Sequence, residues 1–142
     1  MLAHMVNRSN PTRPWASPPS LDDLAAIAEA ALADLPEPFR GAVAGVVIRV
    51  ADFPDAATER QMGLASPFEL LGLYHGVSID QKSAAATPQD VDQVFLYRRP
   101  ILDYWAEGGE SLTDIVRHVL IHEIGHHLGY SDADMHGIER DA

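Results

Sequence analysis

The strongest constraint on the fold of this chain is an apolar segment near its C-terminus that also carries histidines. Residues 112–129 read LTDIVRHVLIHEIGHHLG, and four of the chain's seven histidines fall within residues 118–127. Ser111 followed by Asp114 has the form of a capping box, which predicts a helix that begins at Leu112 and runs to Gly129. Leu, Ile and Val cover nearly every side of that helix, as is typical of a buried one. The core is therefore expected to surround a helix that contains ionisable side chains.

The segments before this helix predict the elements of a small α+β domain. Ser20 and Asp23 form a second capping box ahead of residues 21–35, whose apolar side chains fall on one stripe of a helix. Short β-branched or apolar runs bounded by Gly and Pro predict three strands, at residues 43–50, 71–77 and 91–99. Short helices are expected at residues 56–62 and 100–107, and a loop at residues 80–90. This order predicts an α+β fold in which a small, mostly antiparallel sheet packs on helices.

The composition narrows the class of protein. A chain of 142 residues fits one domain with a single core. With 10 basic and 21 acidic residues its net charge is −11, which argues against nucleic-acid and membrane partners because phosphate binding needs a positive surface. Cysteine is absent, so disulfides and thiolate ligands are excluded, and any metal site must use His, Asp and Glu.

The first 19 residues differ in composition from the rest. They are rich in Pro, Ser and Asn, show no periodicity, and lack the apolar core of a signal peptide. We expect residues 1–19 to form a flexible arm, with Trp15 able to contact the body, and residues 20–142 to form a single domain. No apolar run approaches the roughly 18 residues of a membrane span, so a cytoplasmic protein is expected.

Three of the histidines in the C-terminal helix are predicted to share one stripe. At about 100° per residue, His118 and His126 fall about 40° to either side of His122, and Glu123 lies about 100° from it. The segment His122–His126 has the pattern HExxH, whose two histidines, one turn apart, can both bind one Zn²⁺. Glu123, next to the ion without binding it, is then expected to take a proton from the attacking water. A metal would also offset the desolvation of polar side chains in a buried helix.

A catalytic zinc site generally has three protein ligands, and the third is expected after the end of this helix. Gly129 is suited to a left-handed C-cap that reverses the chain, which can bring Asp132 back toward the metal. Asp134 and His136 are alternatives for the third position, and Asp132 is favoured because the turn at Gly129 sets its reach. The predicted Zn²⁺ ligands are His122, His126 and Asp132.

The segment HEIGHHLGYSD resembles the active-site motif of small, single-domain bacterial zincin-like metallopeptidases, sometimes called minimal metalloproteases. The resemblance extends upstream through FELLGLYHGVS and VFLYRRPILDYW, and it covers roughly residues 20–139. It implies a zincin-like α+β fold, with His122 and His126 as zinc ligands and Glu123 as general base. It also implies that Asp132, at the third position of the motif, completes the ligand set.

Two questions stay open at this point. His118 and His127 neighbour the predicted ligands, and each is compatible with packing, with hydrogen bonding beside the site or, for His118, with substrate contact. Zincins bind peptide substrates along an exposed edge strand beside the active helix. Residues 71–77 and 94–99 are both candidates for that strand.

The leading functional hypothesis is a zinc-dependent metallopeptidase that acts on a peptide or protein substrate. A second hypothesis is a metal-dependent hydrolase of another class, because HHLGYSD also resembles the HLxGYDH motif of endoribonucleases that mature ribosomal RNA. That family lacks a glutamate after its first histidine, where this chain has Glu123, and the negative charge of the chain disfavours RNA. A third is a non-catalytic domain with a structural metal, in which a closed site would leave no open position.

Overall fold

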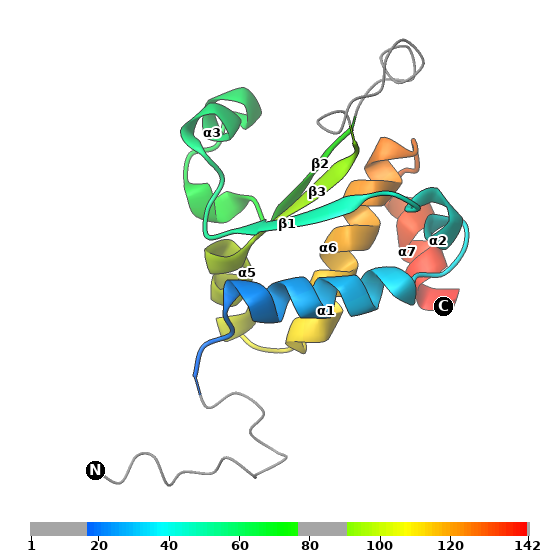
Figure 1. Ribbon diagram of the computed structural model, residues 1–142, viewed down its shortest axis with the longest axis horizontal. Helices are drawn as coiled ribbons and strands as arrows, with labels where there is room; N and C mark the ends of the chain where they lie inside the picture. The colour runs from blue at the N-terminus through cyan, green and yellow to red at the C-terminus, as the bar shows by residue number, and fades with distance from the viewer. Residues whose placement is uncertain (1–16, 77–90, 142) are drawn as a thin grey trace, which may run out of the picture.

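The computed structural model describes residues 17–76 and 91–141, apart from some side chains of the last helix, that of Asp132 among them. Its elements, in chain order, are α1 (Leu21–Ala33), α2 (Phe39–Ala42), β1 (Val47–Ala51), α3 (Ala56–Met62), the 3₁₀ helix η2 (Pro67–Glu69), β2 (Gly72–His75), β3 (Gln93–Tyr97), α5 (Arg98–Ala106), α6 (Leu112–His127) and α7 (Asp132–Asp141). Helices α1 and α6 cover one face of a three-stranded sheet, and α7 lies beside α6 (Figure 1). The expected α+β class is confirmed. None of the helices in the described residues is long and apolar enough to cross a membrane.

The sheet is mixed, whereas a mostly antiparallel one was expected. Its strand order is β1-β3-β2, with β3 parallel to β1 and antiparallel to β2. The difference arises because the chain passes through α3 and β2 before it inserts β3 between the other two strands. Strand β3 is therefore central, and β1 and β2 are the edges. The segment 94–99 is thus no edge strand, and its last two residues belong to α5.

The first helix forms as its sequence predicts. The Ser20 hydroxyl accepts from the Asp23 amide at 3.0 Å, and the Asp23 carboxylate accepts from the Ser20 amide at 2.8 Å. The apolar stripe of α1 is buried at Leu24, Ala28, Ala31 and Leu32. The helix ends two residues earlier than expected, at Ala33.

Two other boundaries differ from expectation. The strand expected over residues 43–50 begins only at Val47, because α2 and a following turn occupy the chain up to that point. Pro19, expected in the arm, is buried, and its carbonyl accepts a hydrogen bond of 2.6 Å from the Arg98 side chain. Residues 1–16, Trp15 among them, and the loop at 80–90 lie outside the described residues.

Helix α6 runs through the core, as its apolar surface predicts. The Ser111 hydroxyl caps its first turn by accepting from the Asp114 amide at 3.0 Å. Eight of its residues are buried, namely Leu112, Ile115, Val116, Val119, Leu120, Ile121, Ile124 and Gly125. The other side of the helix faces away from the core and carries the histidines.

The end of α6 is a Schellman motif built on Gly129, as the sequence predicts. Gly129 has a positive φ of 90°, and its amide bonds the His126 carbonyl at 3.0 Å. The Tyr130 amide bonds the Gly125 carbonyl at 2.9 Å, which completes the motif. The chain then turns back and forms α7, a helix that was not predicted from the sequence.

Candidate metal centre

The histidine stripe of α6 forms as predicted. The rings of His118 and His122 lie 4.2 Å apart, centroid to centroid, and those of His122 and His126 lie 5.8 Å apart. The side chain of His122 is 28 % exposed and that of His118 is 50 % exposed, while His126 lies at the exposed end of the helix. The stripe therefore presents imidazole nitrogens at the surface of a helix whose other side is buried.

Glu123 lies beside the stripe and is tied to the sheet. Its carboxylate accepts a hydrogen bond of 3.3 Å from the backbone amide of Tyr74, in edge strand β2. Burial raises the pKa of the Glu123 carboxyl, and the Tyr74 hydrogen bond and the nearby His126 oppose part of that increase. A half-buried carboxyl with a raised pKa is suited to accept a proton and return it near neutral pH.

Helix α7 is held against α6 by a close contact in which Gly125 is essential. Met135 is fully buried over Gly125, and a Cβ atom added to this glycine would overlap the Met135 sulfur and lie 2.8 Å from its Cγ. Position 125 of the HExxH segment must therefore lack a side chain for Met135 to pack there. Met135 therefore belongs to the packing between α7 and α6.

The start of α7 involves one of the alternative third ligands. The Ser131 amide donates to the Asp134 carboxylate at 3.1 Å, and the Asp134 amide donates to the Ser131 hydroxyl at the same distance. The Ser131 amide first, and the Ser131 side chain second, hold the pKa of the Asp134 carboxyl below its ordinary value by hydrogen bonding to it. Asp134 therefore caps α7. His136 is exposed on that helix, and the side chain of Asp132, its first residue, lies outside the described part of the structure.

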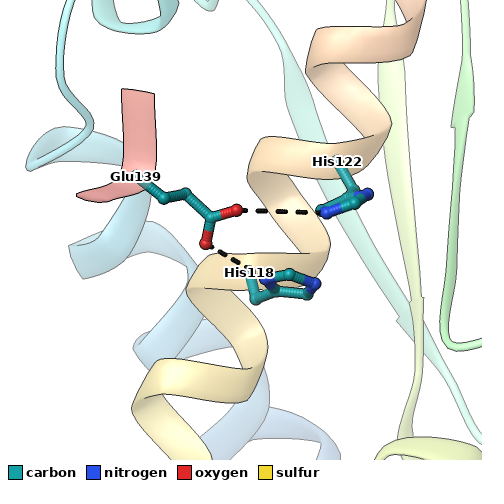
Figure 2. Close-up of side chains that lie close together, drawn as sticks. All are labelled: His118, His122 and Glu139. Carbon is teal, nitrogen blue, oxygen red and sulfur yellow. Dashed lines mark hydrogen bonds and ion pairs between the residues drawn. The ribbon is translucent and has the colours of Figure 1, made fainter. Parts of the chain in front are cut away.

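Glu139, in the last turns of α7, reaches the histidine stripe (Figure 2). One of its carboxylate oxygens lies 3.0 Å from Nδ1 of His118, and the other lies 3.9 Å from Nε2 of His122. The second oxygen is buried and has no hydrogen-bond partner among the described residues. One ligand atom from each of His118, His122 and Glu139 lies within 4.8 Å of the others.

This group was not predicted from the sequence. His118 was expected only as a neighbour of the predicted ligands, and Glu139 lies on α7, a helix that was not predicted. The capping pattern Ser131-x-x-Asp134, which had located two other helices, was the available signal for α7. His126 lies outside the group that the described residues bring together.

One further aromatic contact explains a residue whose role was open. The His127 ring stacks on the Tyr74 ring, with centroids 4.0 Å apart and planes 16° apart. Gly76 makes room for this contact, because a Cβ atom there would overlap the His127 ring. His127 thus joins the end of α6 to β2, away from the histidine stripe, and belongs to the packing.

The donor set of this face fits a divalent metal. Two or more imidazoles with a carboxylate are typical zinc ligands, and a buried carboxylate oxygen without a hydrogen-bond partner is costly unless a cation or donor reaches it. In agreement with this donor set, a family model described as zincin-like metallopeptidase matches residues 43–142.

The chain belongs to the zincin-like metallopeptidase family.

The matched region contains all three strands and helices α5 to α7, so it includes the whole HExxH segment and Glu139. Comparison with curated proteins gives no match. Membership of the zincin-like metallopeptidase family indicates a hydrolase of peptide bonds that depends on a metal. It agrees with the resemblance carried by residues 122–132.

Proposed function

We propose that this protein is a zinc-dependent metallopeptidase that uses Glu123 as its general base. The observation that carries the proposal is the position of Glu123, half-buried beside the HExxH histidines and bonded to the edge strand in a member of this family. Zinc bound at such a site would act as a Lewis acid toward a peptide carbonyl and would make water more acidic. The residues around it determine where the proton goes.

Glu123 is proposed to take the proton of the attacking water and to deliver it to the leaving amine. Burial disfavours the charged carboxylate of Glu123 and so raises the pKa of this carboxyl. A higher pKa makes the carboxylate a stronger base. The Tyr74 amide bond fixes one oxygen of Glu123 and limits the orientations of the carboxylate. A fixed, basic carboxylate can act in both directions of proton transfer within one turnover.

His122, His126 and Asp132 are the proposed zinc ligands. The first two are one helical turn apart, with rings 5.8 Å apart, on the face that carries Glu123 at its side. Support for Asp132 comes from the Schellman turn at Gly129 and from the Met135 contact, which together fold the start of α7 back against α6. Asp134 is less suited, since its carboxylate already caps α7.

Strand β2 is the proposed binding edge for a peptide substrate. It lies at the edge of the sheet, and the Tyr74 amide points away from β3 toward Glu123 on α6. An extended peptide that added to β2 would therefore pass beside the general base. The proposed partner is a peptide or an unfolded protein segment, and its sequence preference is a matter for a peptide-library digest.

The test is hydrolysis by a Glu123→Gln variant loaded with zinc. Glutamine has nearly the same shape but cannot accept the proton, so cleavage of a peptide library should fall about 10²- to 10⁴-fold while zinc content is unchanged. Glu29→Gln, which changes an exposed glutamate on α1 in the same way, is the matched control and should cleave like the wild type. A zinc-loaded Glu123→Gln variant with the wild-type rate would overturn the mechanism.

A further inference from the structure

Helix α6 carries two overlapping histidine pairs, each one turn apart, and His122 belongs to both. His122 and His126 form the pair of the HExxH motif, while His118 and His122 form a second pair one turn earlier. In this structure the rings of the second pair lie closer together, at 4.2 Å against 5.8 Å. Donor atoms of this second pair and of Glu139 lie within 4.8 Å of one another.

Glu139 supplies a carboxylate to the second pair. The donor atoms of ligands about 2.0–2.2 Å from a tetrahedral zinc ion lie about 3.4 Å apart. One Glu139 oxygen lies 3.0 Å from Nδ1 of His118 and the other lies 3.9 Å from Nε2 of His122, and one donor atom from each of the three residues lies within 4.8 Å of the others. Small side-chain adjustments would bring the three atoms around one ion.

The buried oxygen of Glu139 is the observation that favours an ion over a simple ion pair. The His118 contact accounts for one carboxylate oxygen, but the other oxygen has no hydrogen-bond partner among the described residues. At 3.9 Å from Nε2 of His122 it is beyond hydrogen-bond distance, although it is directed toward that ring (Figure 2). A cation at this position would supply the partner that the Glu139 oxygen lacks.

We propose that His118, His122 and Glu139 form a second zinc site, which competes with the HExxH site for the His122 side chain. One imidazole nitrogen binds one ion, so a second ion that takes His122 together with His118 and Glu139 leaves the first ion only His126 and Asp132 as ligands beside Glu123. Excess zinc is then inhibitory. The existence of the second site is independent of the proposed function, whereas the inhibition rests on it.

The binding test uses zinc alone, titrated into the metal-free protein in competition with a chromophoric chelator. In a His126→Gln background the HExxH pair is broken, and we expect one zinc ion still to bind. Adding Glu139→Gln should weaken that binding at least tenfold, since loss of even an outer partner of a metal site costs about 10- to 100-fold. His118→Gln, at a half-exposed position, is the second variant and should act in the same direction without affecting the core.

The control for this test is Glu29→Gln in the same His126→Gln background, which should leave the affinity unchanged. If His126→Gln binds no zinc, or if neither Glu139→Gln nor His118→Gln weakens binding, the second site does not exist. In that case the Glu139–His118 contact only joins α7 to α6.

The competition is tested by hydrolysis at rising zinc concentration. We expect excess zinc to inhibit the wild type and the Glu139→Gln variant to need at least about tenfold more zinc for half-inhibition. Equal inhibition of the two proteins would overturn the competition. If the wild type cleaves no peptide at any zinc concentration, the proposed function fails, and the binding titration still decides whether the second site exists.

Discussion

Replacement of Gly125 by alanine should disturb the contact that holds α7 against α6. The added methyl would overlap the Met135 sulfur, lie 2.8 Å from Met135 Cγ and 3.4 Å from Cε1 of Phe39. Met135 and Phe39 are both fully buried, so neither can turn outward to make room. The least costly response is a displacement of α7, the helix that contains Asp132 and Glu139.

The size of the effect follows from two opposing contributions to the free energy of unfolding. Overpacking of a well-packed core costs about 1–3 kcal/mol. Alanine is favoured over glycine inside a helix by about 1 kcal/mol, so the net loss for Gly125→Ala is about 0–2 kcal/mol. Met135→Ala leaves a void and should cost about 2–5 kcal/mol. In the double variant the clash disappears, so the two changes should be coupled by about 1–3 kcal/mol.

Urea denaturation of the wild type, the two single variants and the double variant forms the double-mutant cycle that measures this coupling. The metal-free proteins report packing alone, and a parallel set with zinc reports the effect on the metal centre. Gly125→Ala should also weaken zinc binding, because it displaces α7. Additive effects, within about 0.5 kcal/mol, would show that Gly125 and Met135 do not restrain each other, and would refute the proposed coupling.

Three further predictions concern the metal-free protein and its sheet. Burial raises the folded-state pKa of Glu123 above its ordinary 4.5. The stability that the protonated carboxyl contributes is therefore complete below pH 4.5, and it is lost as pH rises through the folded-state pKa. Glu123→Gln should therefore raise the melting temperature of the metal-free protein at pH 7 and not below pH 4.5. An equal rise in melting temperature at both pH values would contradict this. Gly72→Ala should lower the free energy of unfolding by about 1–3 kcal/mol, because its Cβ would lie 2.6 Å from Val119 Cγ1 and 2.9 Å from the Phe95 carbonyl oxygen. Gly137→Ala is the control: its Cβ would meet no atom within 4 Å, so it should be neutral or stabilising in the same urea assay. Chelation by EDTA should abolish hydrolysis yet leave a cooperative thermal transition, and complete unfolding on chelation would instead indicate a structural metal.

The helices were the most predictable part of the fold because their signals are local. Ser20 and Ser111 each lie three residues before the aspartate whose amide they cap, and both helices begin where that spacing predicts. Gly129 likewise ends α6 through contacts within five residues. The apolar stripe of α1 and the apolar surface of α6 gave their burial directly from helical periodicity.

The strand order and the Glu139 contact could not be predicted in the same way. Whether β3 pairs with β1 in parallel depends on packing between segments more than 40 residues apart, for which the strand sequences contain no local signal. Glu139 and His118 are 21 residues apart, and their contact depends on how closely α7 approaches α6 over Gly125. The histidine stripe was predictable from spacing, while the carboxylate that meets it was not.

The most direct test of the proposed active site is the position of zinc in crystals of the wild-type protein loaded with one equivalent of the metal. Anomalous diffraction at the zinc edge locates the ion independently of any activity assay. We expect the first zinc ion to lie between His122 and His126, with Asp132 bound and Glu123 beside it but not bound. A first zinc ion held by His118, His122 and Glu139, or one bound directly by Glu123, would contradict it.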